Sequence, residues 1–449
     1  MNQHNEAQPT PEAATPKQAG EARDPWWWVE RSVWTERMLT RLTSGETADR
    51  VWYALADKTY APANLDRAFG KVWGNGGSAG VDAQTVAHFA RHAQAELAWL
   101  HMQVRDGKYR PQPVRRAWIP KLGSPERRPL GIPAVRDRVV QAALRHVLEP
   151  IFETEFAEQS YGFRPGRGAK DALRRVDRLL QAGHDWVVDA DLKSYFDTIP
   201  HDRLLALVKA RVADGRVLAL VESFLRAGVL EEGKGWQPTE RGTPQGGVIS
   251  PLLANLYLDP FDHQMARAGW ELVRYADDFV ILCRSEAEAQ TALSQVRAWV
   301  QEAGLVLHPE KTRIVNAALP GGFDFLGYHF ERGMKWPRKK SLMKLKERVR
   351  QKTPRLDGRS WEEIVLDVNR TLRGWYGYFQ HSKANVFTTV DGYVRRRLRS
   401  LLEKRRGYTR QGLGRAHQRW PNEWFAKHGL LSLAALHEFT RIIVKLRTH

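Results

Sequence analysis

Residues 271–283 read Glu-Leu-Val-Arg-Tyr-Ala-Asp-Asp-Phe-Val-Ile-Leu-Cys, which is two short apolar runs separated by a few polar residues. This pattern predicts a β-hairpin with a tight turn that carries Asp277 and Asp278. Two adjacent carboxylates between buried strands repel each other and resist loss of water, and a divalent cation would relieve both costs. Mg²⁺ suits such a place because it takes few carboxylates and keeps positions for water and phosphate oxygens.

A third carboxylate is expected at the end of a second strand. Residues 186–188 are apolar and lead into Asp189-Ala190-Asp191, where strand alternation places Asp189 and Asp191 on one face. Three carboxylates brought together can hold two metal ions about 3.5–4 Å apart, the arrangement that polymerases use for phosphoryl transfer. The sequence therefore predicts a two-metal site formed by Asp191, Asp277 and Asp278.

The bulk properties of the chain favour a polyanionic partner. The 449 residues suffice for two to four domains, and they carry a formal net charge of +19 with a pI of about 10.0. A single cysteine, Cys283, excludes an intrachain disulfide and a cysteine-rich zinc module. No apolar run approaches the ~18 residues of a membrane span and no signal peptide is evident, so we expect a cytoplasmic protein with no membrane contact.

A basic hairpin is predicted at residues 109–133, where prolines bracket a strand from Val114 to Ile119. A turn at residues 123–125 and a second short strand follow. Lys121 and Arg128 flank this turn and would reach a triphosphate, the lysine as a point charge and the arginine as a fork. The alternative is a solvated basic loop.

Two glycine-rich loops are further candidates for substrate contact. Residues 159–168 contain Arg164 and Arg167, which we expect to point to phosphate, although a simple glycine turn is the alternative. Residues 242–256 hold a Gly-Gly pair that would let the backbone approach a ligand closely, followed after Pro251 by a predicted buried helix.

Two expectations concern the core. Residues 134–149 have apolar residues at helical spacing, and we expect Pro150 to end that helix. A run of tryptophans near the N-terminus, with Trp34 and Trp52 following, is interpreted as core packing in preference to an aromatic contact with RNA.

The C-terminal third changes character, because residues 331–410 contain 23 Lys and Arg against 8 Asp and Glu. Apolar residues at helical spacing predict three helices, marked by Leu342, Leu345 and Val349, by Ile364, Val365, Val368 and Leu372, and by Val390, Val394, Leu398, Leu401 and Leu402. A basic three-helix unit next to a polymerase site predicts a thumb over a nucleic-acid duplex. The arginines expected to bind nucleic acid there are Arg395, Arg396, Arg397 and Arg399.

Together these motifs resemble the reverse transcriptases encoded by group II introns, the maturase family, from about residue 60 to about residue 435. The segment Arg-Thr-Leu-Arg-Gly-Trp-Tyr-Gly-Tyr-Phe at 370–379 resembles the maturase domain. The resemblance implies an α+β right-hand polymerase with fingers and a ferredoxin-like palm, followed by an α-helical thumb/maturase domain. The expected divisions are a disordered tail at 1–24, an N-terminal extension and fingers at 25–180, an interleaved palm at 181–330, the thumb/maturase domain at 331–410 and a C-terminal segment at 411–449. A DNA-binding role for that last segment is left open, and the absence of a Cys pair there implies a family member without the metal endonuclease.

The resemblance also implies roles for individual residues. Two Mg²⁺ ions, for which Mn²⁺ would substitute, would be held at Asp191, Leu192, Asp277 and Asp278. Phe196 would be the steric gate against ribonucleotides, and Lys311 would lie near the nucleotide phosphates. The full nucleotide-binding set is Lys121, Arg128 (or its neighbour Arg127), Phe196, Gln245 and Lys311.

The implied function is an RNA-directed DNA polymerase that copies an RNA template from a DNA primer with deoxynucleotides. Such a protein would also bind group II intron RNA and assist its splicing and mobility. Two alternatives are an RNA-binding splicing cofactor whose polymerase core is only a scaffold, and a domesticated relative that works in DNA repair or phage defence. The three acids and Phe196 favour a working polymerase, and the sequence leaves the oligomeric state open.

Overall fold

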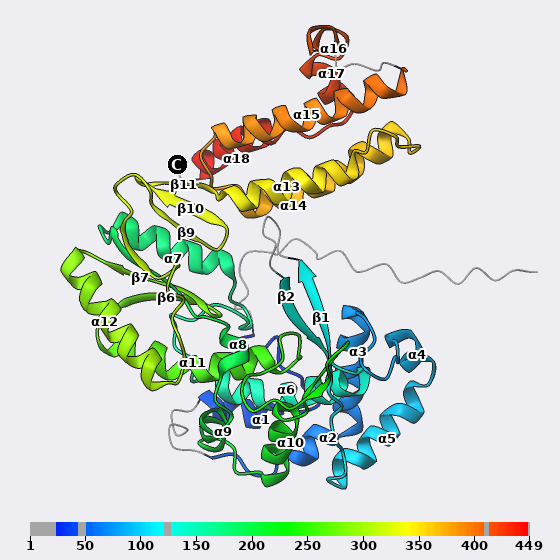
Figure 1. The fold of residues 1–449 in the computed structure, drawn as a ribbon, viewed down its shortest axis with the longest axis vertical. Coiled ribbons are helices and arrows are strands. Elements are labelled where there is room, and N and C mark those ends of the chain that lie inside the picture. The colour runs from blue at the N-terminus through cyan, green and yellow to red at the C-terminus, as the bar shows by residue number, and fades with distance from the viewer. Residues whose placement is uncertain (1–23, 44–50, 121–126, 408–412, 448–449) are drawn as a thin grey trace, which may run out of the picture.

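The computed structural model describes residues 24–43, 51–120, 127–407 and 413–447, arranged as a half-open hand (Figure 1). The tail expected at 1–24 lies outside these ranges except for Asp24. The first part of the chain is mainly helical and contains α1 (Glu36–Thr43), α2 (Ala56–Tyr60), α3 (Pro62–Asn75), α4 (Val86–Arg91), α5 (Ala93–Arg105), β1 (Val114–Pro120), β2 (Arg127–Ile132), α6 (Val135–Glu153) and α7 (Ala169–Gln181).

The palm is a four-stranded antiparallel sheet in the order β6-β7-β3-β8. Its elements are β3 (Trp186–Asp191), α8 (Tyr195–Thr198), α9 (His201–Lys209), α10 (Gly215–Leu225), α11 (Ser250–Arg267), β6 (Glu271–Tyr275), β7 (Asp278–Cys283), α12 (Glu286–Glu302) and β8 (Arg313–Asn316). Helical connections join β3 to β6 and β7 to β8, while β6 and β7 form a hairpin. This order and connectivity are those of a ferredoxin-like sheet, so the predicted palm is confirmed.

Strand alternation gives the palm sheet two different faces. Val188 and Ala190 belong to the large core formed with α11 and α12, whereas Val187 belongs to a smaller core formed with α7. Asp189 and Asp191 follow the alternation of Val187, and they therefore share the α7 face of the sheet. The predicted separation of the acids from the main core is thus correct.

The predicted basic hairpin is also present. β1 and β2 pair antiparallel, with Arg115 opposite Ile132 and Pro120 opposite Arg127, and residues 121–126 lie outside the described part of the chain. Two short strands, β4 (Val229–Glu231) and β5 (Gly235–Gln237), extend the hairpin to a four-stranded fingers sheet in the order β2-β1-β4-β5. The hairpin projects from the fingers toward the thumb (Figure 1).

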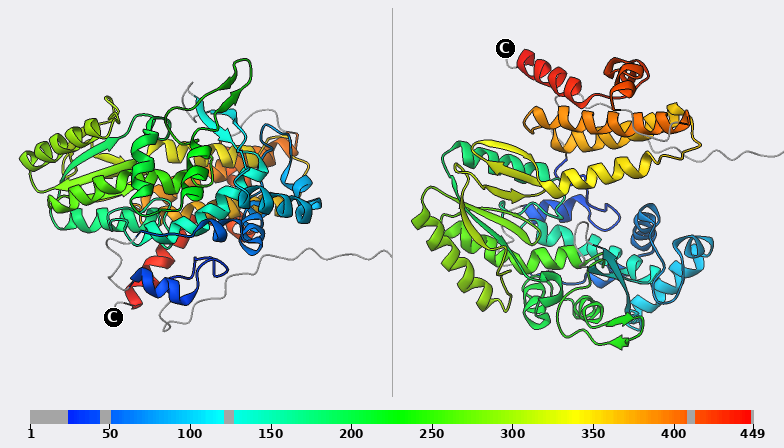
Figure 2. Two further views of the ribbon diagram at one scale, coloured as in Figure 1. Left: turned by 90° about the horizontal axis from the view of Figure 1, so that it is seen from below. Right: turned by 45° about the horizontal axis from the view of Figure 1, so that its top comes forward.

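The thumb is reached through a small antiparallel sheet of β9 (Phe323–Phe325), β10 (Tyr328–Glu331) and β11 (Met334–Pro337). The helices that follow are α13 (Lys339–Lys352), α14 (Trp361–Phe379), α15 (Asn385–Arg405), α16 (Leu413–Arg419), α17 (Asn422–Lys427) and α18 (Leu433–Arg447). The first three are the predicted thumb helices, and Figure 2 shows them lying together above the palm. Trp420, Phe425 and Leu433 share one core with Val368 and Val394, so residues 413–433 pack as part of the thumb.

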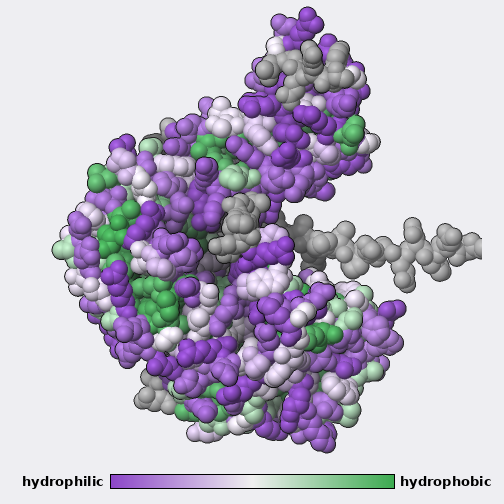
Figure 3. Space-filling view, in the orientation of Figure 1, coloured by the Kyte–Doolittle hydropathy of each residue, from purple (hydrophilic) through white to green (hydrophobic). Residues whose placement is uncertain are grey.

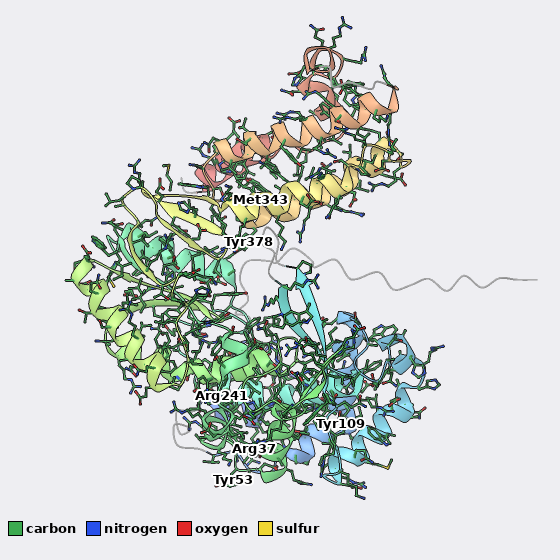
Figure 4. All side chains as sticks on the ribbon, viewed as in Figure 1. Arg37, Tyr53, Tyr109, Arg241, Met343 and Tyr378 are labelled. Carbon is green, nitrogen blue, oxygen red and sulfur yellow. The ribbon has the colours of Figure 1, made fainter. Side chains whose placement is uncertain are left out.

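Reciprocal tyrosine contacts fasten the thumb to the small sheet. Tyr328 donates a hydrogen bond to the carbonyl of Tyr378 at 2.8 Å, and Tyr378 donates one to the carbonyl of Leu326 at 2.8 Å. The Tyr328 ring also packs against Phe379. Tyr378 marks the place where thumb and palm meet (Figure 4).

Helix α6 departs from the sequence prediction, because it continues through Pro150 to Glu153. A proline cannot donate to the carbonyl four residues earlier, which here belongs to His146. Trp34 Nε1 donates to that carbonyl at 3.0 Å, so a buried tryptophan from the N-terminal segment replaces the missing helix hydrogen bond. The assignment of Trp34 to the core is correct.

The space-filling surface is hollowed between the thumb and the fingers, and hydrophilic residues border the hollow (Figure 3). Among the helices that the structure describes, each is either too short or too polar to cross a membrane.

Candidate active site

The pairing of β3 with the predicted hairpin brings two of the three acids together. Asp191, the last residue of β3, is paired directly with Asp278, the first residue of β7. Tyr275 pairs with Asp278 across the hairpin, which leaves a two-residue turn of Ala276 and Asp277. Ala276 has a φ of 58°, a left-handed conformation that costs free energy for a residue with a Cβ atom.

The electrostatics of this corner favour a bound cation. Burial raises the pKa of Asp278 to about 7, and the negative charges of Asp189, Asp191 and Asp277 add to the effect. Burial also raises the pKa of Asp277, with a further contribution from Asp191, and it raises the pKa of Asp189 to about 6. Carboxylates that hold their protons this tightly lack counter-charge, which a divalent cation would provide.

Lys311 supplies part of that counter-charge. Its Nζ lies 2.5 Å from Asp191 Oδ2. Leu192, next to Asp191, forms a β-bridge with Leu307, which lies with Lys311 on the segment between α12 and β8. In the part of the chain that the structure describes, no three His, Cys, Asp or Glu side chains converge closely enough to hold a metal ion as they stand. The donor chemistry nevertheless fits Mg²⁺, since three carboxylates and the adjacent backbone offer oxygen ligands only.

The predicted nucleotide contacts lie on the fingers side of the acids. Arg128 Nε donates to Gln245 Oε1 at 2.8 Å, and Gln245 Nε2 donates to Asp197 Oδ2 at 3.4 Å. The positive charges of Arg128 and Lys311 oppose the rise in the pKa of Asp277, so both cations are close enough to act on the metal corner. Of the two arginines considered for this role, Arg128 is the one that joins Gln245. Lys121 lies outside the described residues.

Phe196 is 8% exposed in the short helix α8, next to the ring of Tyr195. It lines a pocket together with Asp197, Arg116, Trp118 and Thr243. The ring is therefore held by protein on most sides, as a rigid steric gate requires. Its role as the gate stays a prediction.

The Gly-Gly loop does not leave its backbone free for a ligand, which corrects the expectation. A Cβ atom at Gly246 would lie 2.4 Å from the carbonyl oxygen of Gly131 in β2, and Gly131 N donates to the carbonyl of Gln245 at 2.7 Å. The glycine is needed because the loop presses against the fingers hairpin. This contact is what carries Gln245 to Arg128.

Arg164 is not a phosphate ligand, contrary to expectation. Its side chain is 2% exposed, and its guanidinium bonds to Glu153 and to the carbonyl of Ala157 at 2.6 Å. Arg167 is half-buried, donates to the carbonyl of Glu158 and lies over the ring of Tyr161. Both arginines stabilise the loop instead of extending from it.

The four thumb arginines also divide on burial. Arg399 is 5% exposed and donates to the carbonyl of Trp420 and to Asn422, so its assignment to the nucleic-acid surface is wrong. Arg397 donates to the carbonyl of Thr353 at 2.5 Å. Arg396 is exposed and Arg395 half-exposed, so these two remain candidates for phosphate contact.

Sequence reasoning missed the buried polar residues that support the hairpin. Arg274, one of the polar residues between the two apolar runs, is fully buried, and its guanidinium reaches Asp262, Asn255 and the carbonyl of Ala276. Its place in a strand otherwise facing the core was the available signal, because a charged residue there needs a buried partner.

A cavity of about 710 Å³ lies away from these acids, between α7, the small sheet, residues 380–383 and α18. None of the predicted site residues that the structure describes lines it. The site is therefore defined by its carboxylates and not by this cavity.

Comparison with protein families gives two matches that follow each other along the chain. The family described as "Reverse transcriptase (RNA-dependent DNA polymerase)" matches residues 119–330, and the "Group II intron, maturase-specific domain" matches residues 342–422. The first match contains all the predicted catalytic residues, and the second contains most of the thumb.

Two curated relatives illustrate the similarity. Protein YkfC of Escherichia coli (strain K12) is 35% identical over 292 residues, which cover 56% of this chain and 76% of YkfC. The group II intron-encoded protein LtrA of Lactococcus lactis subsp. cremoris is 38% identical over 234 residues, which cover 51% of this chain but only 38% of LtrA. Among solved structures, a telomerase from Candida albicans aligns with 80% of this chain and 69% of its own at 13% identity and a TM-score of 0.40, too distant to carry an argument. From the two domain matches and the coverage of YkfC, the chain belongs to the group II intron reverse transcriptase/maturase family.

Proposed function

We propose that this protein is an RNA-directed DNA polymerase that extends a DNA primer on an RNA template, with Asp191, Asp277 and Asp278 as its metal-binding residues. The observation that carries the proposal is the direct pairing of Asp191 with Asp278 at the ends of adjacent strands, with Asp277 in the intervening turn. Family membership supports the same chemistry, because reverse transcriptases use divalent metal ions.

The three acids and the backbone at Leu192 would hold two Mg²⁺ ions. When bound, these ions supply a lowered pKa for the primer 3′-hydroxyl and positive charge for the triphosphate. Arg128 offers guanidinium donors that remain after its bond to Gln245, and Lys311 offers an ammonium on an exposed side chain. Phe196 would exclude a 2′-hydroxyl by its bulk, because its burial leaves the ring little room to move.

The test is primer extension on an RNA template by purified wild-type protein and by Asp191→Ala, with Mg²⁺ present. We expect extension by wild type and none by the variant, while both bind primer–template equally. A matched control is Asp202→Ala, which removes an exposed aspartate in α9, away from the hairpin. Near-normal extension by Asp191→Ala would refute the metal assignment.

A second function, assistance of group II intron splicing, is supported by the maturase-domain match at 342–422. Intron RNA would be bound by exposed basic residues such as Lys344 and Arg348 on α13. The acids act on one phosphate, whereas RNA folding needs a broad basic surface. Asp278→Ala should therefore keep splicing assistance at low Mg²⁺ and lose DNA synthesis, and Lys344→Glu with Arg348→Glu should weaken the assistance. The intron would be sought in the sequence around the gene.

If wild-type protein accelerates no neighbouring intron yet copies RNA efficiently, the maturase proposal fails. A free-standing reverse transcriptase, working for example in repair or defence, then becomes the better description. If it accelerates splicing but never extends a primer, the core is a scaffold.

A further inference from the structure

A fully buried ion pair lies directly beneath the catalytic hairpin. The side chains of Arg274 in β6 and Asp262 in α11 are 1% and 0% exposed, and Arg274 Nε lies 2.7 Å from Asp262 Oδ1. A second contact joins the guanidinium to Asp262 Oδ2. Burying two charges costs so much hydration that such pairs seldom stabilise a fold more than apolar residues would. Fold stability alone is therefore a weak reason for the pair.

The third guanidinium nitrogen of Arg274, Nη1, does not bond to Asp262 and faces the turn of the hairpin. Arg274 Nη1 donates to the carbonyl oxygen of Ala276 at 2.8 Å and to Asn255 Oδ1 at 3.1 Å. The Ala276 carbonyl belongs to the peptide unit whose N–H is that of Asp277. Fixing this carbonyl therefore fixes the orientation of the peptide that enters Asp277, in a turn where Ala276 already has the strained φ of 58°.

A neighbouring loop completes the support. Asn255 Nδ2 donates to the carbonyl of Gly162 at 2.7 Å, and a Cβ atom on Gly162 would lie 2.3 Å from Ala276 N. The backbone of Arg274 pairs with the same loop, because its N–H donates to the carbonyl of Gln159 and its carbonyl accepts from Tyr161 N, both at 2.9 Å. Helix α11, the loop at 159–162 and the hairpin therefore meet at one guanidinium.

We propose that Arg274 is a positioning residue for the metal-binding carboxylates. Its guanidinium, held by Asp262 and Asn255, locks the Ala276–Asp277 peptide so that Asp277 and Asp278 are ready to bind divalent cations. The inference rests on the proposed function, because it assumes that these two acids are metal ligands.

The main test variant is Arg274→Lys, which keeps a positive charge for Asp262. A lysine ammonium is a point donor and cannot replace a planar fork that serves Asp262, Asn255 and Ala276 together. Binding of Mn²⁺ to the full-length protein is measured by electron paramagnetic resonance at pH 8 without nucleic acid. We expect Arg274→Lys to weaken Mn²⁺ binding about 10-fold to 100-fold, the usual effect of losing a group that orients a metal ligand. The Mg²⁺ concentration for half-maximal primer extension should rise, while the Kd for primer–template stays unchanged.

Two further variants separate positioning from folding. Asn255→Ser leaves the ion pair intact and removes one support, so we expect a smaller shift in the same direction. Arg138→Lys is the matched control, because Arg138 is also buried and binds the carbonyls of Pro133 and Gly76, but at the fingers. It should lower Tm and leave Mn²⁺ affinity unchanged.

Folded Arg274→Lys and Asn255→Ser proteins with wild-type Mn²⁺ affinity would overturn the positioning role. If Arg274→Lys does not fold, Asn255→Ser alone decides in the same way. A wild-type protein that binds Mn²⁺ and loses it in these variants, but never extends a primer, would support positioning and overturn the proposed polymerase.

Discussion

The palm holds a cluster of acidic residues and the thumb is strongly basic, and the two regions use burial in opposite ways. In the palm, burial makes Asp278 unusual, because it raises the pKa of an acid that neighbouring acids already crowd. In the thumb, Arg399 is buried, whereas Arg396 on the same helix is exposed. In the proposed function, the palm would use a few fixed atoms, whereas the thumb would spread its nucleic-acid contacts over many exposed ones.

The difference determines how each region should respond to mutation. A buried carboxylate in a corner of four acids has no substitute, and its loss should be severe. An exposed arginine is one of many cations, and its loss should be small and dependent on salt. The following experiments would sharpen or break this contrast.

The largest effect is expected at Asp277. Asp277→Ala should reduce the rate of Mg²⁺-dependent primer extension about 10³-fold or more, because a metal ion contributes several kcal/mol of transition-state stabilisation and each 1.36 kcal/mol is tenfold in rate. Single-turnover extension with saturating primer–template measures this rate. A decrease of less than tenfold in a folded variant would show that the palm is as tolerant as the thumb.

A stability effect is expected at Asp278. Its folded pKa of about 7 lies above the ordinary value, so the folded state holds this proton more tightly than the unfolded state. The resulting stabilisation is complete below the unfolded pKa and is lost as pH rises through 7. Asp278→Asn removes the ionised form of this side chain. At pH 8, with a chelator present to remove divalent cations, the free energy of unfolding of the variant should exceed that of wild type by up to about 4 kcal/mol.

Chemical denaturation of both proteins at pH 4.5 and pH 8 measures the effect. The variant's advantage should shrink at the lower pH, and Mg²⁺ should stabilise wild type more than the variant. An advantage that is equal at both values would contradict the assigned pKa.

A specificity effect is expected at Phe196. Phe196→Ala should raise the ratio of ribonucleotide to deoxynucleotide incorporation by roughly 10-fold to 100-fold, because it removes bulk where the 2′-hydroxyl would lie. The measurement compares kcat/KM for paired nucleotides. Phe224→Ala, which removes another buried aromatic that lines the same pocket, is the control and should leave the ratio unchanged.

The smallest effect is expected in the thumb. Arg396→Gln should reduce the slope of log K against log salt by about 0.7–0.9 for each phosphate contact that is lost. Arg399→Gln should instead lower Tm and leave the slope unchanged, because its donors serve Trp420 and Asn422. Equal slopes for wild type and Arg396→Gln would show that Arg396 does not contact nucleic-acid phosphates.

Periodicity predicted the elements whose side chains alternate between core and solvent. The hairpin at 271–283, the strand that ends at Asp191 and the three thumb helices all formed as expected, because one face of each is apolar. Pro150 was misjudged because the compensating donor, Trp34, is more than a hundred residues away in sequence.

Arginine burial was the main failure of sequence reasoning. Arginines are usually surface residues, yet Arg164, Arg274 and Arg399 are buried, and each has a hydrogen-bonding or ionic partner. Such a partner is selected by tertiary packing, which places a carboxylate or carbonyl against a particular guanidinium. The meeting of Asp191 with Asp278 was easier to predict, since the acids are adjacent in sequence or lie at the ends of neighbouring strands.

The paired tyrosines at the palm–thumb junction have a consequence for movement during synthesis. Tyr328 and Tyr378 each bond to the other side of the junction, so the thumb cannot tilt without breaking two hydrogen bonds and the packing against Phe379. Each added nucleotide lengthens the product duplex by one base pair. Each of these hydrogen bonds contributes about 1 kcal/mol, so the junction resists tilting of the thumb while the duplex advances. A thumb that keeps its angle to the palm would hold successive phosphates against the same exposed cations as synthesis proceeds.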